Sequence, residues 1–544
     1  MASTPTTKSQ VQAYRFVLRR MQSALVRRDA VMLHDPMRNH SRATAVGVLL
    51  GIVGLLGFLV FGFFKPQPRL DSDTQIAISK ETGQVYVVST NPNQLIPMTN
   101  LASARLLWYQ KSNPDAGGAG GTQDGGSAAA GGTSGEVAVA GGTPKLVSEA
   151  ALAKMPKGRL TGIPDAPDVL PGPSNRIGAE WSVCDTLDLD EFRKNPSIAN
   201  KIDTTVIAGV AGGDQLLDGE NALLVQSKTN DKAYLIYKKP DSLTSISSTT
   251  VRAQVDLKKD PVKAALKLSN KPPRAVSNGL LNAIPEVAPL SAPIIPKQGS
   301  PASYIEGASV KIGEVVEVNR TGASEYFVVL EDGLQHVEPA VGDLIQFTYQ
   351  GTGTTIREVT AAAVANHLEP KKKLKLEEYP AKVPTVLEPN ANNTVVCLGW
   401  RADNVKEGNK SENTKVTLGA GLPVSKDAVP VAINQVGSTG EIVNKFVMVP
   451  GKTAVVRGSQ NITDFGKGPI HIVTGRGVKY GVPDKGTAEA LGLGNVADFP
   501  PAPESILRLL PNGPQLNRND AIRSYDAIPV PKDAGQLPTQ QQGS

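Results

Sequence analysis

The sequence has few aromatic residues, few cysteines and few histidines. Phenylalanine, tryptophan and tyrosine make up 5% of its 544 residues, and it contains two cysteines and five histidines. Such a low aromatic content argues against one large aromatic-rich core, while 53 glycines and 41 prolines indicate short strands, many turns and loose linkers. With roughly 150 residues per domain as a guide, the chain has room for several domains.

A basic surface is also lacking outside the N-terminal tail. The net charge is +6, but residues 1–42 contain eight Lys or Arg and two Asp or Glu, which accounts for all of it. The other 502 residues carry 49 basic and 49 acidic side chains. Because a nucleic-acid-binding domain presents a basic stripe or patch, we expect no nucleic acid among the partners.

Motifs for catalysis or metal binding are missing as well. No Gly-x-Ser-x-Gly elbow is present, no Gly-x-Gly-x-x-Gly follows a strand pattern, and the histidines show no metal-ligand spacing. Pro450-Gly451-Lys452-Thr453 resembles the end of a Walker A motif, but a complete motif needs glycine where the chain has Phe446. Asp71 and Asp73 are expected to be solvated rather than catalytic. We therefore expect no catalytic residue, no cofactor and no metal ion.

One long apolar segment stands out near the N-terminus. The 22 residues from Ala43 to Phe64 carry no charge, and at about 1.5 Å per residue such a helix spans a hydrocarbon core of roughly 30 Å. Gly47 and Gly51 have the spacing of packed membrane helices, although these glycines could also be mere filler. A cleaved signal peptide would have a shorter leader and a small-residue cleavage site, so we interpret the segment as an uncleaved transmembrane helix.

The charge distribution predicts the orientation of this helix. Eight cations precede it in residues 1–42. By the positive-inside rule this flank stays in the cytoplasm, so the 480 residues after Phe64 are expected on the other side of the membrane.

The cytoplasmic tail contains a predicted amphipathic helix. Thr7 and Gln10 have the spacing of a capping box. Apolar residues follow at alternating steps of three and four, with arginines off that line, and so form one apolar stripe: Val11, Tyr14, Leu18, Met21 and Leu25. Such a helix can lie on anionic lipid headgroups or dock into a groove of a cytoplasmic partner, and the residues favour neither over the other.

The exported part contains a weak internal repeat of a strand, a turn, a second strand and a short helix. Glycine-containing turns between apolar runs are typical of hairpins. The first strands of four copies are expected at 84–88, 233–237, 325–330 and 470–473; the second strands are expected at 95–97, Leu243 with Ile246, 334–337 and 478–482. Each copy is too small to bury its own core, so neighbouring copies must pack together.

The two cysteines, Cys184 and Cys397, both lie in the exported part. In an oxidising compartment an even pair predicts a disulfide, which would close a loop of 213 residues. Two buried free thiols are the alternative, and the topology of the chain favours the disulfide.

Several short segments, in a fixed order, resemble the EccB family of type VII (ESX) secretion systems. The N-terminal run from Thr7 to Phe16 is similar to the start of these proteins. Supporting segments are Leu101–Leu106, Gly162–Pro164, Trp181–Asp185, Asn282–Pro285, Tyr480–Val482 and Arg508–Pro514. The resemblance covers roughly residues 7–530 and departs from the family in a Gly-rich insertion and in the lysine-rich stretch at Lys371–Lys373.

The resemblance implies a structural subunit rather than an enzyme, although such proteins are sometimes called ATPases. EccB-like proteins lie in the bacterial inner membrane with EccC, EccD and EccE. Their periplasmic repeats surround a central domain and pair with a second copy, and the family's disulfide would fall at Cys184 and Cys397. The expected fold is therefore a single-pass membrane protein with a mainly β or α+β exported region. Rival functions are a membrane-anchored ATPase, a cell-wall hydrolase and a glycan-binding module.

These observations divide the chain into six segments. The expected segments are a cytoplasmic amphipathic basic helix at 1–42, a transmembrane helix at 43–64, a first exported repeat at 65–110, a flexible Gly/Ala-rich insertion at 111–144, the remaining repeats with the central domain at 145–528, and a disordered tail at 529–544.

Overall fold

The computed structural model describes residues 7–28, 36–63, 70–113 and 141–528. Short gaps within the last range are residues 171, 190–200, 214, 228, 230–231, 240–249, 306–308, 321–322, 352, 369, 404, 406–407, 436, 438–439 and 442. The chain divides into two compact units, Met1–Arg69 and Leu70–Ser544, and the second is called the body below. The expected tail at 529–544 and most of the expected insertion lie outside the described residues.

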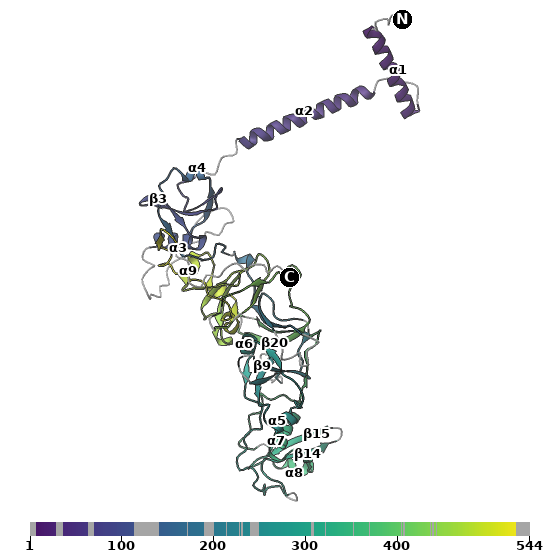
Figure 1. Cartoon of the computed structure of the whole chain (residues 1–544), viewed down its shortest axis with the longest axis vertical. Coiled ribbons are helices and arrows are strands. Elements are labelled where there is room, and N and C mark those ends of the chain that lie inside the picture. The colour runs from purple at the N-terminus through teal and green to yellow at the C-terminus, as the bar shows by residue number, and fades with distance from the viewer. Residues whose placement is uncertain are drawn as a thin grey trace, which may run out of the picture. The chain divides into compact units, whose positions relative to one another are not determined.

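The N-terminal unit consists of two helices (Figure 1). Helix α1 spans Lys8–Arg27, and the Gln10 side chain accepts a hydrogen bond from the Thr7 backbone N–H at 2.9 Å, which satisfies one free donor at the helix start. Helix α2 spans Pro36–Phe63 and has proline at its first position, where a missing N–H costs nothing. Residues 36–42, assigned above to the cytoplasmic segment, thus belong to the same helix as the apolar segment.

Four of the five sheets in the body share one topology. Each of these sheets, together with its helices, is called a module below. Three strands form an antiparallel meander, a helix follows, and a fourth strand returns parallel to the first; a second short helix comes next. Parallel pairing requires a crossover connection, which the first helix of each module supplies. This unit is larger than the expected repeat, which lacked the first and fourth strands. Module 1 comprises β1 (Ile76–Ser79), β2 (Val85–Thr90), β3 (Asn93–Met98), α3 (Leu101–Ser112), β4 (Pro144–Val147), α4 (Glu149–Leu152) and β5 (Leu160–Thr161).

The other three modules repeat this order. Module 2 comprises β9 (Asn221–Ser227), β10 (Ala233–Lys238), β11 (Thr250–Val255), α5 (Asp260–Ala265), β12 (Arg274–Val276), α6 (Asn278–Ala283) and β13 (Glu286–Val287). Module 3 comprises β14 (Val315–Arg320), β15 (Ala323–Val329), β16 (Leu334–Val337), α7 (Pro339–Tyr349), β17 (Arg357–Glu358) and α8 (Ala361–Ala365). Module 4 comprises β23 (Ala454–Ser459), β24 (Ile470–Val473), β25 (Lys479–Val482), α9 (Lys485–Ala490), β26 (Pro501–Pro503) and α10 (Glu504–Leu507). The strand expected at Leu243 and Ile246 falls outside the described residues, and β11 supplies the second hairpin strand of that copy.

A single backbone hydrogen bond recurs in all four modules. A residue of the third strand donates its N–H to a carbonyl that follows the second helix, at distances of 2.7–2.9 Å: Leu95 to Pro156, Arg252 to Pro285, Leu334 to His367 and Lys479 to Pro511. The same connection, from the third strand to the residues after the second helix, in four separate stretches of sequence indicates that the modules are copies of one structural unit.

The central sheet has seven strands in the order β21-β22-β7-β6-β19-β20-β8. Its strands come from two separate parts of the chain, one before module 2 and one after module 3: β6 (Glu180–Leu187), β7 (Ile202–Ala208) and β8 (Gln215–Leu216), then β19 (Val395–Asp403), β20 (Ser411–Gly419), β21 (Val431–Ala432) and β22 (Lys445–Met448). One buried cluster joins Trp181 and Trp400 of this sheet to Leu223 of module 2 and Ile506 of module 4. The sheet is therefore the common core for parts far apart in sequence.

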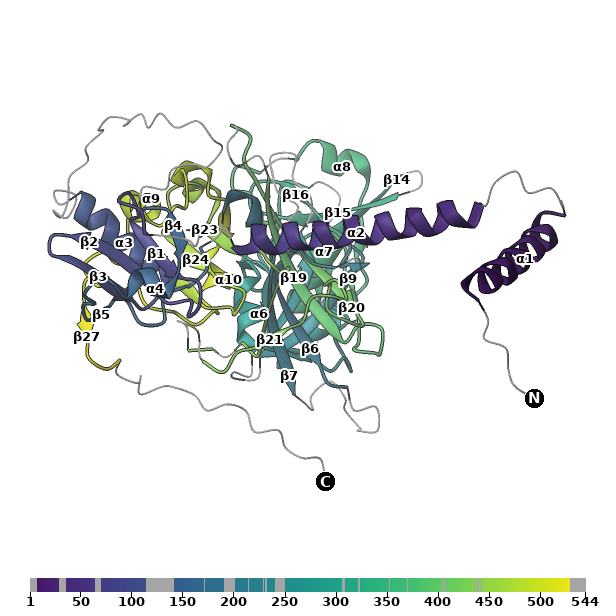
Figure 2. The same ribbon diagram turned by 90° about the horizontal axis from the view of Figure 1, so that it is seen from above.

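The modules themselves pack in two pairs through their first helices. Helix α3 of module 1 contacts α9 of module 4, and Leu106 and Ala488 share one buried cluster there (Figures 1 and 2). Helix α5 of module 2 contacts α7 of module 3, and Val262 and Leu344 share another. Two short strands complete the body: β18 (Thr385–Val386) pairs with β9, and β27 (Ser524–Tyr525) pairs with β5. Neighbouring copies thus complete one another's cores, as expected for units of this size.

Candidate functional site

The apolar stripe of α1 is uncovered in the chain. Tyr14 is 67% exposed, Met21 57% and Leu25 78%, and Val11 and Leu18 are exposed as well. Uncovered apolar side chains on one helix face cost free energy in water, at about 25 cal/mol per Å². The stripe is thus a surface that either a membrane or another protein would stabilise.

Helix α2 is the one helix in the described part of the chain that is long and apolar enough to cross a membrane. Residues Arg42–Phe61 have a mean hydropathy of 2.5, and none of that stretch is buried against the rest of the chain. A Cβ added at Gly47 or at Gly51 would meet no neighbouring atom, so the glycine positions of the predicted packing motif are open.

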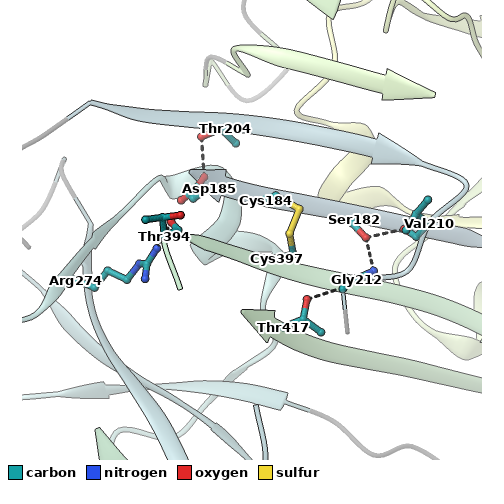
Figure 3. Close-up of a disulfide and its surroundings, with 11 residues drawn as sticks. Ser182, Cys184, Asp185, Thr204, Val210, Gly212, Arg274, Thr394, Cys397 and Thr417 are labelled. Atoms are coloured by element: carbon teal, nitrogen blue, oxygen red, sulfur yellow. Dashed lines mark hydrogen bonds between the residues drawn. A yellow bond between two sulfur atoms is a disulfide. The ribbon is translucent and has the colours of Figure 1, made fainter. Parts of the chain in front are cut away.

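A disulfide joins Cys184 of β6 to Cys397 of β19 across the middle of the central sheet (Figure 3). The two residues are directly opposite in the antiparallel register, their Cα atoms lie 4.0 Å apart, and both are buried. The sequence separation of 213 residues includes modules 2 and 3. The bond therefore links the strand that leads into this pair of modules to the strand that follows them.

A short segment, residues 210–213, crosses the central sheet next to the disulfide. The Ser182 hydroxyl donates to the Val210 carbonyl at 2.6 Å and accepts from the Gly212 N–H at 2.7 Å. Gly213 N–H donates to the Thr417 hydroxyl at 2.8 Å. A Cβ at Gly399 would lie 2.5 Å from the backbone of this segment, so glycine is needed there for the close approach. Val210 of this segment packs against the buried cluster that contains both cysteines.

Buried charged groups lie on the opposite face of the same two strands. Asp185 follows Cys184 and accepts hydrogen bonds from the Thr204 hydroxyl, the Ser277 hydroxyl and the Ser277 N–H. Burial raises the pKa of the Asp185 carboxyl, and these hydrogen bonds and the nearby Arg274 oppose that rise. Burial lowers the pKa of Arg274 to about 10. Neither Asp185 nor Arg274 stands out in the sequence as a functional residue, although Asp185 lies within one of the segments that carry the family resemblance.

The segment that resembles a phosphate loop is a connection between two strands. Residues 449–453 join β22 of the central sheet to β23 of module 4, whereas a phosphate loop leads from a strand into a helix. Phe446 is buried in β22, and the Lys452 ammonium donates to the Ser174 carbonyl at 2.8 Å. Gly451 has a positive φ of 75°, as a tight turn requires.

The three histidines of the body are divided between two modules. His336 and His367 belong to module 3 and His471 to module 4; the side chains of His34 and His40 are outside the described part. No group of three or more His, Cys, Asp or Glu side chains that could hold a metal ion occurs among the described residues. Burial, with the Lys479 ammonium as a second cause, lowers the pKa of His471 to about 4.

Comparison with known proteins gives matches along the whole chain. The EccB family model, described as Type VII secretion system ESX-1, transport TM domain B, matches residues 3–530. The ESX-1 secretion system ATPase EccB1 of Mycobacterium tuberculosis is 28% identical over 545 residues, which cover 99% of both chains. The ESX-3 secretion system ATPase EccB3 of the same species is 30% identical over 560 residues, which cover 99% of this chain and 93% of that one.

Solved structures share the fold. A chain of an intact ESX-5 inner membrane complex superposes with a TM-score of 0.66 at 25% identity and covers 99% of each chain. The EccB3 dimer from the ESX-3 core complex superposes with a TM-score of 0.63 at 25% identity, covering 83% of this chain and all of that one. The similarity includes the body with its several sheets as well as the N-terminal helices.

Proposed function

Because the chain belongs to the EccB family of membrane components of ESX type VII secretion systems, we propose that it acts as a structural subunit of the inner-membrane complex and contributes to its periplasmic assembly. The observation that carries this proposal is the match of 99% of the chain to a chain of an intact ESX-5 inner membrane complex. A second superposition, with the periplasmic assembly of the same complex, covers 88% of the chain and agrees in fold.

The proposed topology has α1 in the cytoplasm, α2 in the membrane and the body in the periplasm. The cation-rich flank before α2 supports the cytoplasmic assignment by the positive-inside rule. The disulfide between Cys184 and Cys397 supports an oxidising location for the body. We keep the six segments as the proposed division, with α2 beginning at Pro36 and module 1 continuing after the insertion to Thr161. Modules 2 and 4 share a buried cluster with the central sheet, module 1 packs on module 4, and module 3 packs on module 2.

The apolar stripe of α1 is the proposed docking surface for the other membrane subunits, which we take to be EccC, EccD and EccE. Its exposed side chains at Leu18 and Met21 suit an apolar groove, and the arginines off the stripe would contact the rim. Membrane lipid is the competing occupant of the same surface. In the periplasm, we propose a second copy of the chain as partner, because the relative EccB3 forms a dimer.

Enzymatic activity receives less support than a scaffold. Relatives carry ATPase in their names, but the one segment that resembles a phosphate loop here joins two strands, and its lysine donates to a backbone carbonyl. For a hydrolase, the described residues offer no metal cluster. The exposed large apolar side chains of the described body are all aliphatic, which gives a glycan-binding module little support.

Two matched double variants test the proposal. Leu18→Asp with Met21→Asp places two charges on the stripe, and Ala13→Asp with Phe16→Asp places two charges on the far side of the helix, about 140° away at 100° per residue. Full-length proteins are expressed in the bacterial host, extracted in mild detergent and run on native gels.

The wild type and the Ala13/Phe16 variant are expected to run with the other subunits. The Leu18/Met21 variant is expected to run alone, since loss of two anchors costs about 2 kcal/mol or more, at least about 30-fold in affinity. A wild-type chain that runs alone would contradict the subunit proposal. A Leu18/Met21 variant that stays in the complex would assign the stripe to lipid.

A further inference from the structure

One short segment of module 2, residues 274–277, contacts β6 and the two residues that precede β19. Figure 3 shows Arg274 beside Thr394. At one end, Arg274 lies on β12 and reaches the chain just before β19; at the other, Ser277 caps α6 and reaches β6. Both residues approach the face of the central sheet opposite to the disulfide. The segment therefore joins the two cysteine strands independently of the sulfur atoms.

The contacts at the Ser277 end fix β6. The Asp185 carboxylate accepts from the Ser277 N–H at 2.6 Å and from the Ser277 hydroxyl at 2.8 Å, and also from the hydroxyl of Thr204 on β7 at 2.8 Å. Asp185 is 2% exposed. A buried carboxylate with three donors is held in one position, because any displacement would leave a charge without partners in a region of low dielectric.

The contacts at the Arg274 end fix the start of β19. The guanidinium donates to the Asn393 carbonyl at 2.6 Å and to the Thr394 carbonyl, and Arg274 is also 2% exposed. Its charge attracts the Asp185 carboxylate. The planar fork of arginine can hold two successive carbonyls in fixed positions, which a lysine cannot do.

These contacts specify the register of the two strands. Cys184 and Cys397 are paired across β6 and β19, with Asp185 and Val396 as the next pair. A slip of one residue in an antiparallel pair moves every side chain of a strand to the other face. A slip of either strand would separate the thiols. A slip of β6 would also remove Asp185 from Ser277, and a slip of β19 would move the Asn393 and Thr394 carbonyls away from Arg274. The register that satisfies the buried charges is thus the one that brings the sulfur atoms together.

We propose that Asp185, Arg274 and Ser277 form a register latch that positions Cys184 and Cys397 for oxidation and keeps the two strands paired when the disulfide is reduced. The latch and the disulfide are then thermodynamically coupled: each favours the same register, so each stabilises the other by the same factor. The latch acts before the disulfide exists, and it favours the bond within one chain over bonds between chains. This inference concerns the body alone and does not depend on the docking function of α1.

The test measures how readily the disulfide is reduced. Full-length protein in detergent is equilibrated with mixtures of reduced and oxidised dithiothreitol, free thiols are trapped by alkylation, and the dithiol fraction is read from intact mass. Arg274→Met removes the latch. Arg252→Met is the matched control, because Arg252 is a buried arginine of the same module that donates to the Ile284 carbonyl and to Glu286 without touching the cysteine strands.

Arg274→Met is expected to shift the equilibrium toward the dithiol by about tenfold, within the range typical of coupled interactions, while Arg252→Met stays within about twofold of wild type. Ser277→Ala removes one donor to Asp185 and should shift it in the same direction by a smaller factor. If Arg274→Met does not fold, Ser277→Ala decides the matter. The proposal would be overturned if Arg274→Met folds and has the same dithiol fraction as the wild type. It would also be overturned if Ser277→Ala, Arg252→Met and the wild type all have the same dithiol fraction.

Discussion

At the residue scale, burial decides what the titratable side chains of the body do. His471 lies on β24 of module 4, where neither ring nitrogen has a hydrogen-bond partner among the described residues. Burial and the nearby Lys479 ammonium disfavour its protonated form and lower its pKa to about 4, compared with an ordinary value of 6.5. A neutral histidine is thus built into the folded body at neutral pH.

His471 is therefore expected to make the body less stable in acid. A histidine whose pKa is lower in the folded state contributes its full stability above pH 6.5, and that contribution is lost as the pH falls toward 4. The loss is at most about 3 kcal/mol, from about 1.4 kcal/mol per pKa unit. His471→Gln should show a shallower fall in the free energy of unfolding between these pH values.

Denaturant unfolding at several pH values measures this difference. The three tryptophans, Trp108, Trp181 and Trp400, all lie in the body, so their fluorescence reports its unfolding in the full-length protein. His336→Gln is the control, since His336 is exposed on β16. Identical pH profiles for wild type and His471→Gln would contradict the assignment.

Single residues differ in how far the sequence reveals their role. The cysteine pair could be predicted because the chain has only two cysteines and both lie in the exported part. The partners of Asp185 could not, since Ser277 and Arg274 lie about ninety positions away and only the folding of module 2 against the central sheet brings them together. Local patterns carry no information on such a contact.

At the element scale, local patterns predicted hairpins and helices better than sheets. The hairpin strands β2 with β3, β15 with β16 and β24 with β25 coincide with the expected runs, because apolar residues around a turn specify both strands at once. The first strand of each module and its parallel partner were missed. The fourth strands β4, β12, β17 and β26 have only two to four residues and are defined by pairing with a strand far away in sequence.

The connection between β22 and β23 gives a second prediction at this scale. Since the Lys452 ammonium donates to the Ser174 carbonyl at an exposed position, Lys452→Ala should cost about 1 kcal/mol of stability or less. ATP hydrolysis by the purified full-length protein is expected to equal background in both wild type and variant. Stoichiometric nucleotide binding that disappears in Lys452→Ala would show that this segment binds phosphates after all.

At the scale of the whole body, the same order of modules and central-sheet strands occurs twice along the chain. A module, strands of the central sheet and a second module occur in the first half, and the same succession occurs in the second half. The two halves meet at β6 and β19, which lie side by side in the central sheet and carry the disulfide. The module pairs formed by α3 with α9 and by α5 with α7 each combine one module from each half. The sequence indicated the repeats but not this pairing, which depends on contacts across the full length of the body.

The most direct test of the scaffold function is whether the inner-membrane complex assembles without this chain. In a strain of the host that lacks the chain, the remaining subunits are followed by native-gel mobility after extraction of the membranes. A structural role predicts that the large complex disappears, and that both the wild-type chain and Lys452→Ala restore it. A structural role would be contradicted if a complex of nearly unchanged size forms without the chain while secretion stops. It would also be contradicted if the wild-type chain restores the complex and Lys452→Ala does not.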